Sequence, residues 1–126
     1  MEPVPTAVRE LVRKRVRTMD HVEVLMRLHA LGAQTASAAQ LIASSGLGHQ
    51  TVTKALADLV RDELVAESPD GEFRFKPADV DDVATVAALS QLYHQRPVTL
   101  VKLVYEQPAA PLSTFADAFR LRDDKK

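Results

Sequence analysis

Five polar side chains open the stretch HQTVTKALADLVR: His49, Gln50, Thr51, Thr53 and Lys54. Their side chains form hydrogen bonds and carry little negative charge. Gln50 has the paired donor and acceptor that match adenine, and Lys54 suits guanine or a phosphate. The two threonines suit a phosphate or a thymine methyl group. These residue types therefore favour recognition of DNA.

A helix can present these side chains together on one face. A rotation of about 100° per residue turns one group toward the helix's buried side, namely Val52, Leu56, Leu59 and Glu63. It turns another group toward solvent, namely Gln50, Lys54, Ala57 and Arg61. The helix is expected from about His49 to Asp62. In this docking mode, the N-terminal half of such a helix faces the bases.

Two shorter elements come before this helix. Asp20 and Glu23 are spaced as an acidic capping box for a helix over about residues 20–31. Ser37 and Gln40 form a second such box at the start of the helix AAQLIASS, and Gly46 is its expected left-handed terminator. Two helices joined by a tight glycine-containing turn make a helix-turn-helix.

A hairpin is expected directly after the helix-turn-helix. Residues 64–67 and 72–76 read as strands, because Phe73 and Phe75 alternate with charged residues in the second segment. The sequence Ser-Pro-Asp-Gly between them favours a type I turn.

Three helices followed by a hairpin are the order of a winged helix-turn-helix. The segment AAQLIASSGLGHQTVTKALADLVRDELV resembles winged-helix transcriptional regulators at its apolar positions, namely Leu41, Leu47, Val52, Leu56, Leu59 and Leu64. The resemblance covers about residues 20–78. It implies a mainly helical fold with a small β-hairpin, and DNA binding by the third helix of this domain.

Helices are also expected on both sides of this domain. A basic N-terminal helix in residues 1–19 begins near Thr6, buries Val8, Leu11, Val12 and Val16, and exposes Arg9, Arg13, Lys14 and Arg17. In residues 79–126, Asp79 caps a first helix and Pro97 starts a second, which is apolar almost all round. A short third helix carries Phe115 and Phe119 on one face.

Flanking helices of this kind resemble the MarR-type arrangement, in which they form a dimer interface. The resemblance implies that residues 79–126 contain the homodimer contacts. The candidates are Val98, Val101, Leu103, Val104, Tyr105, Phe115 and Phe119.

Charge is distributed unevenly along the chain. Residues 1–19 carry a net charge of +3, residues 20–78 carry −3 and residues 79–126 carry −1. The expected wing holds the acids Glu67, Asp70 and Glu72 with Arg74 as its nearby cation, and Asp58 stands where related helices often have arginine. The DNA-binding candidates are His49, Gln50, Thr51, Thr53, Lys54, Arg61, Arg74, Arg13, Lys14 and Arg17.

Other function classes find little support in the sequence. It has no nucleophile motif and no glycine-rich phosphate loop, so we expect no enzyme and no cofactor. With four histidines and no cysteine, and with His21 and His29 poorly spaced on their helix, no metal site is expected. The lack of a secretory signal, of cysteine and of a long apolar run fits a cytoplasmic protein outside the membrane.

Two interpretations remain. The first is a homodimeric transcriptional regulator that binds double-stranded DNA. The second is a winged-helix module that binds another protein and has lost or weakened its DNA binding, which the acidic wing and Asp58 favour. Salt-dependent DNA binding through Gln50 and Lys54 would separate them.

Overall fold

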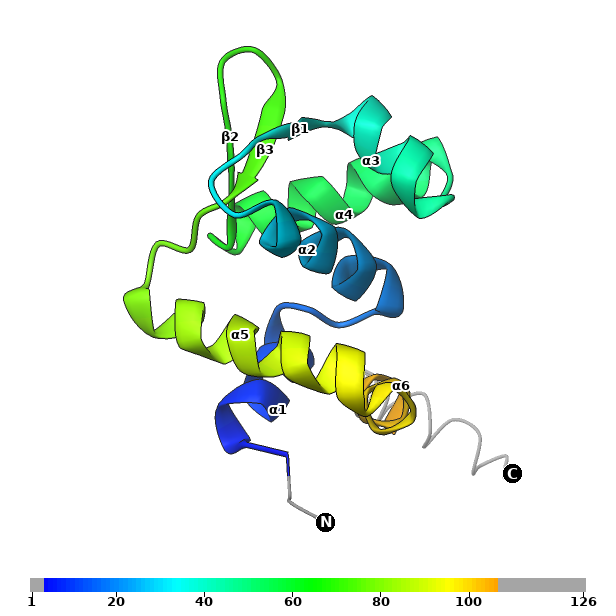
Figure 1. The fold of residues 1–126 in the computed structure, drawn as a ribbon, viewed down its shortest axis with the longest axis vertical. Coiled ribbons are helices and arrows are strands. Elements are labelled where there is room, and N and C mark those ends of the chain that lie inside the picture. Colours follow the sequence, from blue (N-terminus) through cyan, green and yellow to red (C-terminus); the bar gives the residue numbers. More distant parts are fainter. Residues whose placement is uncertain (1–3, 107–126) are drawn as a thin grey trace, which may run out of the picture.

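The computed structural model describes residues 4–106, and its helices form two layers (Figure 1). One layer contains α2 (Met19–Leu31), α3 (Ala38–Ser45) and α4 (His49–Arg61), together with a small sheet. The other contains α1 (Thr6–Lys14), α5 (Val80–Gln95) and α6 (Pro97–Glu106), which contact one another. The layers place the chain's first and last described helices side by side.

The sheet has three antiparallel strands in the order β1-β3-β2. The expected hairpin is present as β2 (Val65–Glu67) and β3 (Glu72–Phe75). Its turn is closed by a 2.9 Å hydrogen bond from the backbone N–H of Gly71 to the carbonyl oxygen of Ser68. A third strand, β1 (Ala36–Ser37), pairs with β3 and was not predicted. The mainly helical fold with a small sheet is confirmed, and it is compatible with a winged-helix arrangement.

Side-chain caps explain where several helices begin and end. At α3 the Ser37 hydroxyl accepts from the N–H of Gln40, whose side chain accepts from the N–H of Ser37, and Gly46 ends the helix with φ 76°. Asp79 caps α5 through the N–H of Asp81. These predicted caps are confirmed. At α2 the cap is Thr18, which accepts from the N–H of His21, so the expected acidic box at Asp20 is wrong.

Two helix ends differ from the prediction. Helix α1 stops at Lys14, and Arg15 is its C-cap, so Val16 and Arg17 lie beyond the helix. Val16 is nevertheless fully buried, which is why its spacing looked helical. Helix α4 ends at Arg61 with Asp62 as its C-cap. Glu63 follows with φ 65° and is exposed, so its expected inward position is wrong.

The buried side chains form one cluster that includes both layers. It joins Leu25, Leu56 and Leu59 of the first layer to Leu89 and Leu100 of the second, and each is at most 2% exposed. The helix-turn-helix and its flanking helices therefore share one hydrophobic core. None of the described helices is both long enough and apolar enough to cross a bilayer.

Candidate nucleic-acid interface

Helix α4 has one buried face and one open face, as its periodicity predicts. Its inward side chains contact α2 and α3 and are almost inaccessible to solvent, namely Val52, Ala55, Leu56 and Leu59. Its exposed residues are His49, Gln50, Thr53, Lys54, Ala57 and Arg61, while Thr51 is half-buried. The predicted orientation of the helix is confirmed. Amide, hydroxyl and ammonium groups therefore stand in solvent along the first two turns.

The beginning of α4 carries no local negative charge. Its N-cap is Gly48, no side chain accepts a hydrogen bond there, and its first turn has no acidic residue. Helices α2, α3 and α5 differ, because a side chain caps each of them. The positive end of the α4 dipole is therefore available to an approaching phosphate.

A cleft of about 500 Å³ brings the N-terminal cations beside α4. Its wall includes Lys14 and Arg17 from around the end of α1, and Lys54 and Arg61 from α4. The other lining residues are Arg15, Thr18, His21, Asp58, Asp62, Val104 and Tyr105. Among all the residues that line the cleft, five are Lys or Arg and two are Asp. Four of the predicted DNA-binding residues thus meet at one surface.

The other DNA-binding candidates lie apart from this cleft. Arg13 is bound to Glu10 through a 2.8 Å ion pair on α1. Arg74 is half-buried on β3, where it faces Ala66 across the strand pair. Neither residue belongs to the described cleft wall. The polar residues at the start of α4 form a separate surface beside it.

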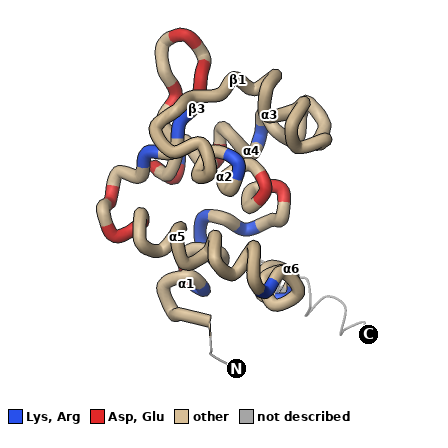
Figure 2. Tube along the Cα trace, in the orientation of Figure 1, with Lys and Arg blue, Asp and Glu red and all other residues tan. Residues whose placement is uncertain are grey.

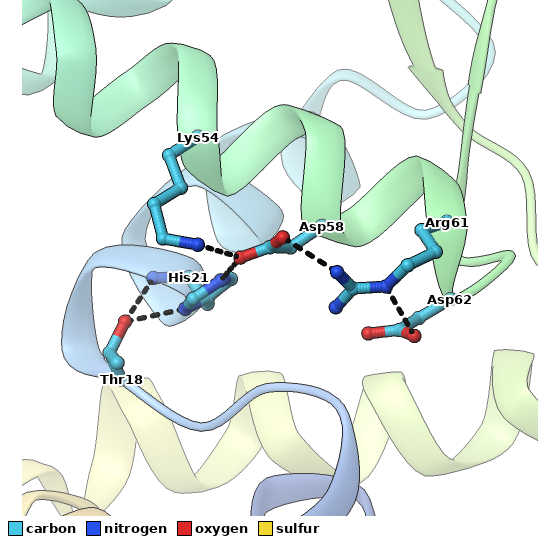
Figure 3. A network of polar contacts seen from close by, with 6 residues as sticks. All are labelled: Thr18, His21, Lys54, Asp58, Arg61 and Asp62. Atoms are coloured by element: carbon cyan, nitrogen blue, oxygen red, sulfur yellow. Dashed lines mark hydrogen bonds and ion pairs between the residues drawn. The ribbon is translucent and has the colours of Figure 1, made fainter.

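Asp58 holds the two cations of α4 together (Figure 3). Its carboxylate lies 3.1 Å from the Lys54 ammonium and 3.1 Å from the Arg61 guanidinium. Its Oδ2 is also 2.9 Å from Nε2 of His21, which comes from α2. Arg61 has a second, looser contact of 3.5 Å with Asp62. Asp58 is unusual in the sequence, but no local pattern predicts its contact with His21.

This network changes the acidity of its carboxylate. The hydrogen bond from His21 holds the pKa of Asp58 below its usual range, and Lys54 adds to the effect, while burial opposes it. Asp62 and Asp58 raise the pKa of Arg61. The ionised form of Asp58 is therefore the one that the folded protein favours.

A pH-dependent contribution to stability follows from the lowered pKa. Because the pKa of Asp58 is lower in the folded chain than in the unfolded chain, its contribution is fully present above about pH 4. It should disappear as the pH falls through the folded pKa. We expect Asp58→Asn to be less stable than the wild type near neutral pH, with the difference shrinking in acid. Urea unfolding from pH 7 down to pH 2 would measure it.

His21→Leu provides the control for this measurement, because it removes the main cause of the lowered pKa. In that background Asp58→Asn should change the pH dependence much less. A stability difference that stays constant from pH 7 to pH 2 would contradict the prediction.

A second ion pair, not anticipated from the sequence, joins the end of α1 to α5 in the second layer. The Arg15 guanidinium donates to both carboxylate oxygens of Asp82 on α5, at 2.9 and 2.7 Å. It also contacts the backbone carbonyl of Asp62 at 3.3 Å, and Asp82 raises the pKa of Arg15. Arg15 therefore connects the C-terminal ends of α1 and α4 to the first turn of α5.

The predicted dimer surface is only partly open to a partner. Val98 is 67% exposed, Val101 38% and Tyr105 73%, and their spacing forms one stripe along α6. Val104 is 4% exposed because it packs into the chain's own core, so it is unavailable to a second copy. Leu103 is half-buried against the same core. Phe115 and Phe119 lie outside the described residues.

The loop between β2 and β3 is acidic, as Figure 2 shows. Glu67 and Asp70 are exposed there, and Glu72 is half-buried and accepts a hydrogen bond from the Thr35 hydroxyl. These charges repel a phosphate backbone.

Within residues 4–106, no group of three or more His, Asp or Glu side chains is arranged to hold a metal ion. No protein-family model and no curated protein matches the sequence.

Proposed function

We propose that the chain is a sequence-specific DNA-binding regulator that acts as a homodimer in the cytoplasm. The observation that carries this proposal is the surface of α4. Its exposed Gln50, Thr53 and Lys54 lie beside the cleft to which Lys14 and Arg17 also contribute. A major groove admits a helix of this kind, and cations on its flank would contact the adjoining phosphates.

The proposed roles divide between base and phosphate contacts. Gln50 and Thr53 read base edges, while Lys54, Arg61, Lys14 and Arg17 bind the backbone. One α4 helix with these few cations is a weak binder, because affinity depends on the number of phosphates that are neutralised. A second copy would double the contacts and let two α4 helices enter successive major grooves. The exposed stripe of Val98, Val101 and Tyr105 on α6 would contribute to the pairing.

The test begins with selection of bound sequences from a random duplex pool. On the selected duplex, Gln50→Ala should weaken binding about tenfold, with a much smaller effect on a scrambled duplex. Because Asp58 holds the Lys54 ammonium, Lys54→Ala should weaken binding to both duplexes by an equal and smaller factor, and slightly flatten the dependence of affinity on salt. Fluorescence anisotropy at several salt concentrations would measure both.

Thr85→Ala on α5 provides a control away from α4 and should leave both affinities unchanged. Affinities that are insensitive to Gln50→Ala and Lys54→Ala would contradict the proposal. Light scattering that shows a strict monomer, with and without the selected duplex, would contradict its dimeric part.

The second candidate function is a protein-binding module, favoured by the acidic loop between β2 and β3. Glu67 and Asp70 would attract a basic partner surface rather than DNA. Affinity capture with and without nuclease separates the two functions. Partners that survive nuclease and are lost in Glu67→Lys support the module, whereas enrichment of one duplex sequence supports the regulator.

A further inference from the structure

The Asp58 carboxylate already engages the two cations that α4 would offer to an anion. Three donor groups converge on it: His21 Nε2 at 2.9 Å, and the Lys54 and Arg61 cations at 3.1 Å each. A DNA phosphate would need the same two cations. We infer that Asp58 is an internal competitor for phosphate that limits the binding of polyanions of any sequence.

Burial makes the carboxylate a fixed competitor rather than a mobile one. The Asp58 side chain is 13% exposed, whereas those of Lys54 and Arg61 are 75% and 69% exposed. The acid lies between its two cations, which remain open to solvent (Figure 3). Lys54 lies four positions before Asp58 and Arg61 three positions after it, so all three share one helix face. The contacts therefore require no distortion of α4.

His21 and Thr18 hold the carboxylate in this position. The His21 ring is anchored at Nδ1 by the Thr18 hydroxyl, and that hydroxyl also caps α2 by accepting from the backbone N–H of His21. Nε2 is then directed at Asp58, and the His21 side chain is 12% exposed. Rotation of Asp58 away from its cations would break the hydrogen bond to His21. His21 is thus a positioning residue for the competitor.

We expect Asp58 to weaken the phosphate contacts of α4 but not its contacts with the bases. Lys54 and Arg61 release fewer counterions from DNA while Asp58 neutralises them, which weakens binding to every sequence alike. Gln50 and Thr53 are not members of this network, so base reading is unaffected. Asp58 therefore lowers affinity for DNA of any sequence while preserving the difference between sequences. The part of this inference that concerns duplex DNA rests on the proposed DNA binding, whereas competition for a polyanion does not.

The experiment compares Asp58→Asn with the wild type on heparin and on duplex DNA. Asn keeps an acceptor for His21 and removes the charge. We expect the variant to elute from heparin at higher salt, and to bind a scrambled duplex about tenfold more tightly near 0.1 M salt. The slope of log affinity against log salt should steepen by about one to two. The selected duplex should gain by a similar factor, so the ratio of the two affinities stays unchanged.

The matched control is Asp81→Asn, which removes an exposed carboxylate from the first turn of α5 and changes the net charge equally. It should leave heparin elution and both affinities within about twofold of the wild type. A melting curve checks that each variant is folded. Asp58→Ser, which also retains a hydrogen-bonding group, replaces Asp58→Asn if that variant fails to fold.

A double-mutant cycle distinguishes competition from a general charge effect. Lys54→Gln should lower heparin elution only slightly in the wild type, but clearly in the Asp58→Asn background, because the ammonium is released there. Unchanged heparin elution in Asp58→Asn, or equal effects of Lys54→Gln in both backgrounds, would overturn the inference. Since heparin has no specific site, loss of the proposed sequence-specific binding would leave this result interpretable.

Discussion

Leu59→Ala should lower the free energy of unfolding by about 2–5 kcal/mol, the largest loss that we expect from a single side chain on α4. Leu59 has no exposed surface and packs in the core between α4 and α2. Truncation removes buried methyl groups and leaves a cavity that close-packed neighbours cannot fully close. Urea unfolding at one fixed protein concentration would measure the loss, since a dimer's stability depends on concentration.

Leu31→Ala is the matched control, because it makes the same truncation at a leucine that is 37% exposed at the end of α2. Its cost should stay below about 1 kcal/mol. Comparable losses for the two variants would mean that α4 does not turn Leu59 inward. The same result would remove the reason for placing Gln50 and Lys54 in solvent, because both assignments depend on one rotation of the helix.

The sequence predicted best the elements whose signals lie within a few residues. The capping box of Ser37 and Gln40, the left-handed Gly46 and the Asp79 cap each involve residues at most four positions apart, and all are confirmed. The inward face of α4 was also predictable, because burial of Val52, Leu56 and Leu59 leaves a clear helical period.

The predictions were wrong where a short stretch of sequence is compatible with more than one local structure. Thr18 and Asp20 are both residue types that cap helices, and the chain uses Thr18. Val16 keeps a helical spacing with Val12, but the chain has left α1 at Lys14 and still buries the side chain. Strand β1 has two residues and exists because β3 pairs with it, so its own sequence carries no alternating pattern.

The candidate site shows the same division. The exposed polar residues of α4 were found from periodicity alone. The contacts that control its charge were not, because His21 and Asp58 are 37 residues apart and Arg15 and Asp82 are 67 apart. No local spacing encodes such pairs. Asp58 stood out only as an acid in a helix expected to face DNA, and its role required the position of α2.

Asp82→Asn should lower the free energy of unfolding by about 2–3 kcal/mol. Asp82 is 8% exposed, and both of its oxygens accept from Arg15. Loss of its charge leaves the partly buried Arg15 guanidinium facing a neutral amide. Among the described residues, its other acceptor is the Asp62 carbonyl at 3.3 Å. The guanidinium keeps 30% of its side chain exposed, so water offsets part of the loss. Urea unfolding near neutral pH would measure it.

A double-mutant cycle with Arg15→Gln isolates the ion pair from the loss of either partner. The two substitutions together should cost less than the sum of their separate costs by about 1 kcal/mol or more, because the second no longer removes an intact contact. Asp81→Asn, at the exposed neighbouring position, should change stability by no more than about 0.5 kcal/mol. Additive costs for Arg15 and Asp82 would mean that apolar contacts such as Leu89 alone fix α5, and that the end of α4 is positioned without this pair.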